Sequence, residues 1–149
     1  MKDYSKQACE NFKKGYNCAQ SVILAFADDL KIDKMLLSQM ASSFGGGMGR
    51  LREVCGAVSA MFIIAGIKSG YSTPETGEIK ATHYKLIQDL AEEFKKEHGT
   101  IICRELLGEL AGEESHIPSE RTEQYYTTRP CEKCIENAAK IIEKYFYMD

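Results

Sequence analysis

Apolar residues recur every three or four positions along most of the chain, a spacing that places them on one face of an α-helix. Ile135, Ala138 and Ile142 form one such stripe near the C-terminus, with charged residues between them. No stretch of useful length alternates apolar and polar residues in the manner of a half-buried strand. Residues 1–149 are therefore predicted to form a single all-α domain, a compact bundle of about five to seven helices.

Helix-start signals divide this pattern into separate helices. The residues suited to N-cap positions are Asn17, Asp33, Thr73 and Thr100, and Pro130 is suited to the start of the last helix. Thr73 is followed by Pro74 and Glu75, which is the combination expected in the first turn of a helix. Gly99 is expected to end that helix.

The longest apolar run, from Val54 to Ile67, predicts a buried helix that begins near Glu53 and ends at Gly70. At roughly 14 residues the run is too short to cross a bilayer, which requires about 20. Residues 112–128 are polar and mixed in character, and they predict a loop.

Charge and composition exclude several classes of protein. The formal net charge is −3 and no block of basic residues alternates with aromatic ones, so we expect no nucleic-acid partner. The charged N-terminal residues contain no apolar signal segment, and with no membrane span predicted we expect a cytoplasmic protein. In that reducing compartment, six cysteines are better explained as ligands, redox groups or buried thiols than as a disulfide framework.

Four of the cysteines follow helix-start signals. They are Cys18 after Asn17, Cys55 after a glycine-rich loop, Cys103 after Thr100 and Cys131 after Pro130. The free N–H groups and the helix dipole at such positions lower the pKa of a thiol and favour the thiolate. Four thiolates that faced one point would repel one another, so a positive group such as a metal ion or an iron–sulfur cluster would have to lie between them.

A glycine-rich loop lies just before the second of these cysteines. Its glycines are Gly45, Gly46, Gly47 and Gly49, and we expect them to bind the cofactor. Glycine lets the backbone approach a bulky inorganic group, and successive N–H groups form a nest for anions. Arg50 and Arg52 are expected to balance the remaining negative charge. The nucleotide-binding fingerprints are excluded, because no strand precedes the loop and no Lys-Ser/Thr pair follows it.

These motifs resemble those of the C_GCAxxG_C_C family, small proteins with four characteristic cysteines and a CGAxxG motif. The motif corresponds to residues 55–60, and the other similar segments are GYNCAQSV at 15–22, FGGGMGR at 44–50, CRELLG at 103–108 and RPCEKCIENAAKII at 129–142. The chain departs from the family pattern at Ala60, which replaces the last glycine of the motif. It also has two additional cysteines, Cys9 and Cys134.

The resemblance implies a redox-active protein with a prosthetic group such as an iron–sulfur cluster, and therefore electron transfer to a redox partner that the sequence does not identify. It also implies which residues are the family's four cysteines. They are Cys18, Cys55, Cys103 and Cys131.

Two other interpretations stay open. Cys131 and Cys134 are three positions apart on one helix, so they are expected to be neighbours and could act as a metal-free thiol–disulfide pair with Cys131 as the nucleophile. Alternatively the chain is a structural or binding protein, such as a homodimer, whose thiols hold zinc or fill the core. Cys9 lies in the middle of a predicted helix and is most simply a packing residue.

Overall fold

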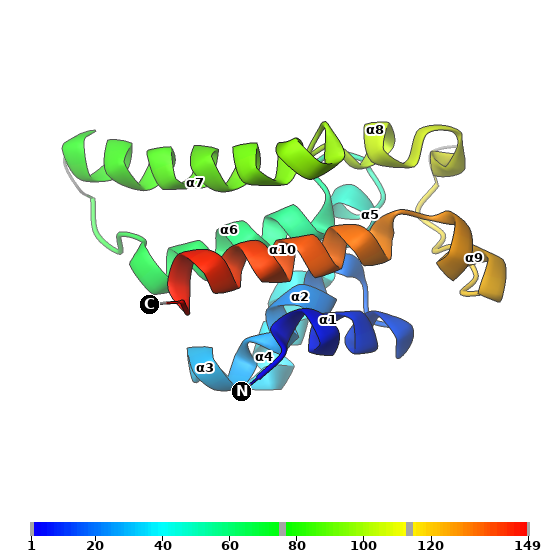
Figure 1. Ribbon diagram of the computed structural model, residues 1–149, viewed down its shortest axis with the longest axis horizontal. Coiled ribbons are helices and arrows are strands. Elements are labelled where there is room, and N and C mark those ends of the chain that lie inside the picture. Colours follow the sequence, from blue (N-terminus) through cyan, green and yellow to red (C-terminus); the bar gives the residue numbers. More distant parts are fainter. Residues whose placement is uncertain (1, 75–76, 113–114, 149) are drawn as a thin grey trace.

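Helices form most of the described part of the chain, which comprises residues 2–74, 77–112 and 115–148 of the computed structural model (Figure 1). In chain order the helical segments are α1 (Tyr4–Lys13), α2 (Cys18–Ala25), α3 (Ala27–Leu30), α4 (Lys34–Ser42), α5 (Gly45–Met48), α6 (Gly56–Ser69), α7 (Gly77–His98), α8 (Cys103–Leu107), the 3₁₀ turn η1 (Gly108–Ala111), α9 (Glu123–Thr128) and α10 (Cys131–Phe146). These ranges contain no strand, which confirms the all-α prediction. The helices outnumber the five to seven predicted, because short segments such as α3, α8 and α9 are separate helices.

The N-cap predictions at Asn17 and Asp33 are confirmed. The Asn17 side chain accepts a hydrogen bond from the Gln20 N–H at 2.8 Å, and the Gln20 side chain accepts one from the Asn17 N–H at 3.1 Å. The Asp33 carboxylate accepts a hydrogen bond from the Leu36 N–H at 3.0 Å. Each bond satisfies an N–H group that has no partner inside its own helix, so the two side chains fix where α2 and α4 begin.

Two predicted helix starts differ from the structure. The Thr100 hydroxyl accepts a hydrogen bond from the Ile102 N–H at 3.1 Å, and Ile102 is the N-cap residue of α8, which begins at Cys103. The buried helix α6 begins at Gly56, later than predicted, because Val54 forms an isolated antiparallel bridge with Ile102. Both differences have the same cause, since the two segments pair with each other before their helices begin.

The segment predicted as a loop, residues 112–128, contains α9. Thr122 caps this helix by accepting a hydrogen bond from the Tyr125 N–H at 3.1 Å, a signal that the mixed polarity of the segment concealed. Residues 113–114 of that segment and Glu75 of the predicted start of α7 lie outside the described residues.

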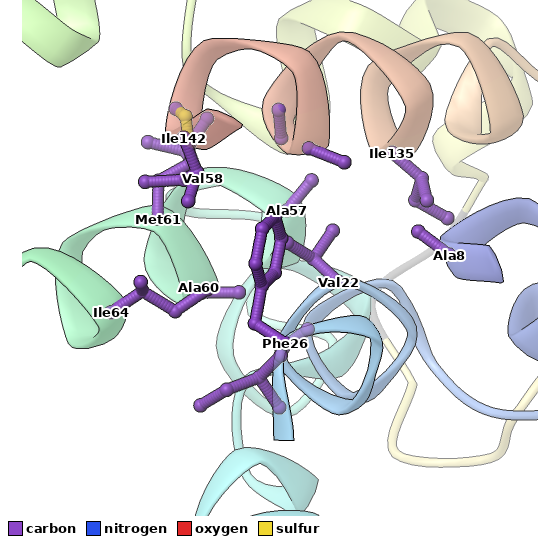
Figure 2. Close-up of a cluster of buried hydrophobic side chains, with 14 of the residues drawn as sticks. Ala8, Val22, Phe26, Ala57, Val58, Ala60, Met61, Ile64, Ile135 and Ile142 are labelled. Atoms are coloured by element: carbon purple, nitrogen blue, oxygen red, sulfur yellow. The ribbon is translucent and has the colours of Figure 1, made fainter. Parts of the chain in front are cut away.

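The core is built around α6, whose residues are buried on several sides. It packs against α2 and α10, with α7 on one side of the bundle and α1 beside α2 and α10 (Figure 1). Val58 and Met61 of α6 meet Ile142 of α10, and Phe26 lies beside Ala57, all of them fully buried (Figure 2). Burial of each large apolar side chain stabilises the fold by about 1.5–3 kcal/mol. This packing holds the starts of α6 and α10 at the same end of the bundle.

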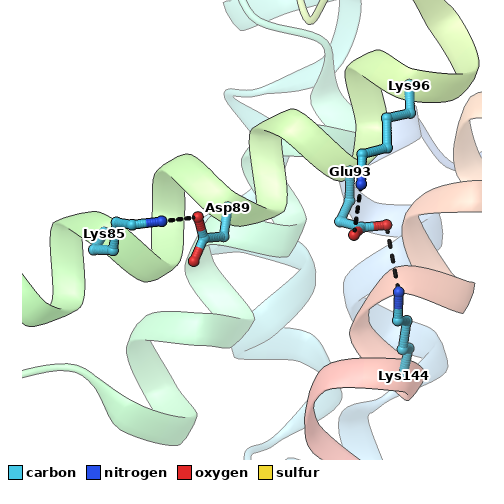
Figure 3. A network of polar contacts seen from close by, with 5 residues as sticks. All are labelled: Lys85, Asp89, Glu93, Lys96 and Lys144. Carbon is cyan, nitrogen blue, oxygen red and sulfur yellow. Dashed lines mark hydrogen bonds and ion pairs between the residues drawn. The ribbon is translucent and has the colours of Figure 1, made fainter.

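The long helix α7 is joined to α10 by charged side chains. The Glu93 carboxylate lies 3.4 Å from Nζ of Lys96 and 3.5 Å from Nζ of Lys144 on α10, and Lys85 pairs with Asp89 within α7 (Figure 3). Such exposed pairs are worth at most about 1 kcal/mol each, so apolar packing determines the position of α7. Neither α7 nor any other helix of the described ranges combines the length and apolar character that a membrane crossing requires.

Candidate functional site

Five of the six cysteines line one small cavity where α2, α6, α8 and α10 begin. They are Cys18, Cys55, Cys103, Cys131 and Cys134. The cavity has a volume of about 60 Å³, which is enough for a few water molecules or a small inorganic group. A larger open groove of about 850 Å³ lies between α1, α2 and α4, but no cysteine lines it. The reactive side chains are therefore concentrated at the smaller cavity.

A short antiparallel pairing brings Cys55 and Cys103 together. The Cys55 N–H donates to the Ile101 carbonyl at 2.8 Å, and the Cys103 N–H donates to the Glu53 carbonyl at 2.6 Å. The two segments thus lie side by side although α6 and α7 separate them in the sequence. Cys55 is the N-cap residue of α6, and Cys103 is the first residue of α8.

Cys18 is the first residue of α2, and its neighbour Asn17 also holds the glycine-rich loop. Nδ2 of Asn17 donates a hydrogen bond to the Ser42 carbonyl at 3.2 Å. A Cβ on Gly45 would lie 2.5 Å from the same Nδ2 atom, so only glycine lets the loop lie this close to α2. Asn17 therefore positions both Cys18 and the loop.

The glycine-rich loop turns sharply, because several of its residues adopt left-handed backbone conformations. Gly46 and Gly47 have φ angles of 67° and 72°, so α5 is a turn with helical hydrogen bonds rather than a regular helix. Arg50 and Arg52 have φ angles of 66° and 61°, a conformation that costs a non-glycine residue about 1–3 kcal/mol. A Cβ on Gly47 would lie 2.6 Å from Cβ of Cys103. The loop therefore reaches the cavity wall at the cost of backbone strain.

One aromatic ring and two guanidinium groups form the α9 side of the cavity. The guanidinium carbons of Arg129 and Arg121 lie 4.4 Å and 4.9 Å from the centre of the Tyr125 ring. Arg121 also donates hydrogen bonds to the carbonyls of Phe12 at 3.2 Å and Tyr16 at 3.0 Å. These polar contacts with the end of α1, together with packing of the Tyr125 ring 6.1 Å from that of Phe12, hold Tyr125 at the cavity.

The thiols of Cys18 and Cys131 form a pair between α2 and α10. A hydrogen bond from Cys18, together with the positive charges of Arg129 and Arg121, lowers the pKa of Cys131 to about 7. The same hydrogen bond and burial raise the pKa of Cys18. Above about pH 7 the pair therefore consists mainly of a thiolate at Cys131 and a thiol at Cys18 that donates to it.

Cys55 and Cys134 form a second thiol pair, between α6 and α10. The hydrogen bond from Cys134 lowers the pKa of Cys55, and the N–H groups of Ala57 and Val58 act in the same direction. That hydrogen bond and burial raise the pKa of Cys134. Sγ of Cys134 also lies 3.9 Å from Nδ1 of His98, the last residue of α7, and burial lowers the pKa of this histidine.

Cys103 is partnered by an arginine. Nη1 of Arg52 donates to Sγ of Cys103 at 3.6 Å. Burial raises the pKa of Cys103, and the Arg52 charge opposes this effect. Arg52 is only 4% exposed, and its Nη2 has no hydrogen-bond partner among the described residues. A buried guanidinium with an unused donor at the cavity wall favours negative charge inside the cavity.

The structure brings the four predicted cysteines to one cavity, but their side chains do not form a ready metal site. Within the described ranges, no three cysteine, histidine, aspartate or glutamate side chains are arranged to hold a metal ion. Of the glycines predicted to bind a cofactor, Gly46 and Gly47 line the cavity, whereas Gly45 and Gly49 do not. Cys9 lies outside the cavity on α1, where it is half-buried.

Sequence patterns did not single out Arg121, Arg129 and His98 as neighbours of the cysteines. Arg121 lies in the segment predicted as a loop, and its place at the cavity depends on contacts with α1. Arg129 lies two positions before Cys131, and this closeness in the sequence was the one signal that could have predicted its place beside the thiols. His98 approaches Cys134 only through the packing of α7 on α10.

Comparison with known proteins finds one family whose model covers most of the chain. The family model described as "Putative redox-active protein (C_GCAxxG_C_C)" matches residues 16–145, a range that contains the glycine-rich loop and all five cavity cysteines. No curated protein and no solved structure matches the chain.

Proposed function

Because the chain belongs to the C_GCAxxG_C_C family of redox-active proteins, we propose that it transfers electrons through an iron–sulfur cluster held by four thiolates. The ligands would be Cys18, Cys55, Cys103 and Cys131. One observation carries the proposal, namely that four separate helix starts deliver these four thiols to a single cavity. Such an arrangement is difficult to explain by core packing alone, because apolar side chains would fill the same space without charge repulsion.

The donor set and its electrostatic surroundings suit such a cluster. Thiolate sulfurs are the usual protein ligands of iron–sulfur clusters, and helix N-termini favour the thiolate form. Arg52, Arg121 and Arg129 line the same cavity and supply positive charge. The unused donor on Nη2 of the buried Arg52 is available to an anionic sulfide or thiolate.

Two glycines allow the backbone to approach the proposed cluster. A Cβ on Gly47 would meet Cβ of Cys103 at 2.6 Å, and a Cβ on Gly56 would lie 3.1 Å from Cβ of Cys18. Larger residues at these positions would push the ligands away from the cavity. The absence of side chains at the two glycines would thus keep the space between the cysteine sulfurs open for the cluster.

The thiols would have to leave their present partners to hold the cluster. As they stand, they are hydrogen-bonded to one another or to Arg52. Cluster binding would require the cysteine side chains to adopt rotamers that turn their sulfurs toward a shared centre. When bound, a cluster of this kind accepts and releases single electrons at a potential set by burial and by hydrogen bonds to its sulfurs. The chain itself contributes the Arg52 donor, and the Tyr125 ring lines the same cavity.

Anaerobic purification followed by iron, acid-labile sulfide and visible-absorption measurements tests the proposal. We expect iron and sulfide in the wild-type protein and in Cys9→Ser, because Cys9 lies outside the cavity. Cys18→Ser and Cys103→Ser are expected to lose most of both elements. A wild-type protein that stays free of iron after anaerobic reconstitution would overturn the proposal, and zinc in its place would support the zinc alternative.

A metal-free thiol–disulfide function is the second candidate, and the Cys18–Cys131 pair is the observation that favours it. The Cys131 thiolate would attack a partner disulfide and form a mixed disulfide, releasing one partner thiolate. Cys18 would then attack Cys131, giving an internal disulfide and releasing the second partner thiol. The sequence suggested Cys134 for this resolving role, but in the structure Cys134 donates its hydrogen bond to Cys55.

Treatment of the reduced, metal-free protein with oxidised glutathione tests this second candidate. Peptide mapping of early samples is expected to find a disulfide between Cys18 and Cys131, and Cys131→Ser should abolish it. A disulfide between Cys131 and Cys134 as the first and final product would favour the pair suggested by the sequence. If no internal disulfide forms, the second candidate is rejected.

A further inference from the structure

Cys134 has no part in the proposed cluster, yet its surroundings are unlike those of a packing residue. It is 1% exposed, lines the cavity and hydrogen-bonds to Cys55. On the side of α7, its Sγ lies 3.9 Å from Nδ1 of His98. A thiol that only filled the core would be surrounded by apolar groups, whereas this thiol lies between two polar partners.

The four paired thiols form an outer pair and an inner pair. The outer pair, Cys18 and Cys131, is partly exposed. The inner pair, Cys55 and Cys134, is buried, with 6% and 1% exposure. An oxidant that enters from solvent therefore meets the outer pair first, and the inner pair is shielded behind it.

The first turn of α10 connects the two pairs. Cys131 and Cys134 lie three positions apart on this helix, which places their side chains on the same face, and both line the cavity. Each of them is also hydrogen-bonded to a cysteine of another helix. Along one face of α10, these two cysteines thus link the partner Cys18 on α2 with the partner Cys55 on α6.

We propose that Cys55 and Cys134 are a second redox-active thiol pair, which is oxidised by disulfide exchange from the Cys18–Cys131 pair through the first turn of α10. This activity belongs to the metal-free chain and goes beyond the proposed electron transfer. It also gives a role to the CEKC sequence, in which Cys131 and Cys134 exchange partners instead of forming the final disulfide.

Hydrogen peroxide is an oxidant small enough for the cavity, and its reaction with the outer pair can be written in balanced steps. The Cys131 sulfur attacks one peroxide oxygen, the O–O bond breaks, and Cys131 becomes a sulfenic acid while hydroxide leaves. The Cys18 thiol then attacks Cys131, an S–S bond forms, and the sulfenic hydroxyl leaves as water with the Cys18 proton. One peroxide has then oxidised two sulfurs by two electrons.

Exchange to the inner pair needs no further oxidant. The Cys134 sulfur attacks Cys131 and breaks the outer disulfide, and Cys18 leaves and takes the proton that Cys134 loses. The Cys55 thiolate then attacks Cys134, and Cys131 leaves as a thiolate. The outer pair is reduced again, and the inner pair holds the disulfide.

A time course on the full-length, metal-free protein tests the exchange. The reduced chain receives one equivalent of hydrogen peroxide, samples are quenched with acid, free thiols are alkylated, and the disulfides are mapped by mass spectrometry. We expect the Cys18–Cys131 disulfide first and the Cys55–Cys134 disulfide later. Cys55→Ser should trap a disulfide between Cys131 and Cys134, because the last exchange partner is missing.

Cys131→Ser is the decisive variant. It should slow formation of the inner disulfide by at least ~10-fold, since the buried thiols lose their nucleophilic route to the oxidant. Cys9→Ser should leave both disulfides and their rates of formation unchanged. Circular dichroism of each reduced variant verifies that it folds. Cys131→Ala is a second variant that removes the same thiol and should slow the inner disulfide in the same way. The proposal is overturned if wild type never forms the inner disulfide, or if that disulfide forms at an undiminished rate in Cys131→Ser. Because the readout is a disulfide in metal-free protein, either result is independent of whether the chain binds iron.

Discussion

The thiol of Cys18, at the start of α2, donates a hydrogen bond to Cys131, at the start of α10. The two residues lie near opposite ends of the sequence, so the bond exists only in the folded chain. It is the largest of the influences that lower the pKa of Cys131, ahead of the nearby arginines. Folding therefore sets the reactivity of the Cys131 thiol.

Alkylation by iodoacetamide should reveal this reactivity in the reduced, metal-free protein. Since the pKa of Cys131 is lowered from 9.0 to about 7, its thiolate predominates above that pH and reacts, and its alkylation slows as the pH falls below that value. Cys9 is an internal control, because burial raises its pKa to about 11 and keeps it protonated over the same range. Mass spectrometry of the two cysteine peptides at each pH measures both midpoints.

Two variants test the cause of the lowered pKa of Cys131. Cys18→Ala removes the hydrogen bond and should move the alkylation midpoint upward, toward 9.0. Arg129→Gln removes a smaller influence and should move it in the same direction by less. A wild-type midpoint near 9.0, or a midpoint that neither variant changes, would contradict the assignment.

Gly47→Ala and Gly49→Ala separate steric crowding from backbone conformation. Both positions have left-handed φ angles, 72° and 62°, so each alanine costs about 1–2 kcal/mol in conformational energy. Only at Gly47 would the new methyl also meet Cβ of Cys103, at 2.6 Å, whereas the nearest atom to Gly49 is at 3.9 Å. Gly47→Ala should therefore lower the unfolding free energy by more than Gly49→Ala in urea denaturation. Equal losses would show that the loop does not press on Cys103.

Glu93→Gln should lower the unfolding free energy by less than about 1 kcal/mol, because its ion pairs with Lys96 and Lys144 are at the surface. The hydrogen bond from Lys96 lowers the pKa of Glu93 below its usual 4.5. The stabilisation is thus present above pH 4.5 and is lost as the pH falls through the lowered pKa. Urea denaturation at pH 7 and in acid measures it, with Glu92→Gln as the control within α7. A loss of several kcal/mol would mean that the ion pairs hold α7 in place.

His98 should make the protein less stable as the pH falls below 6.5. Burial lowers its pKa from that value, so the unfolded chain binds a proton at a pH where the folded chain does not. His98→Gln is expected to reduce this loss of unfolding free energy between pH 7 and pH 5, and the exposed His116→Gln should not change it. Identical pH dependence in wild type and His98→Gln would contradict the burial of the imidazole.

The features that the sequence predicted are those with a local cause. Asn17 caps α2 through a residue three positions away, and Pro130 precedes α10, so these helix starts were visible as short patterns. The start of α8 was misplaced, because it depends on the pairing of Cys103 with Glu53 across two helices. Which cysteine each thiol pairs with depends likewise on side-chain packing between helices. The spacing of residues within one segment cannot predict that packing.

The antiparallel link between Cys55 and Ile101 has a consequence for the order of folding. This link joins the middle of the chain to its second half, and α10 also lines the cavity. Forming the cavity therefore closes long loops of chain, which carries a large loss of chain entropy. During synthesis, the cysteines near the N-terminus must therefore wait for the last helix before they meet their partners. A peptide with only the CEKC turn, or a fragment that stops before α10, should contain reactive thiols without the cavity that organises them.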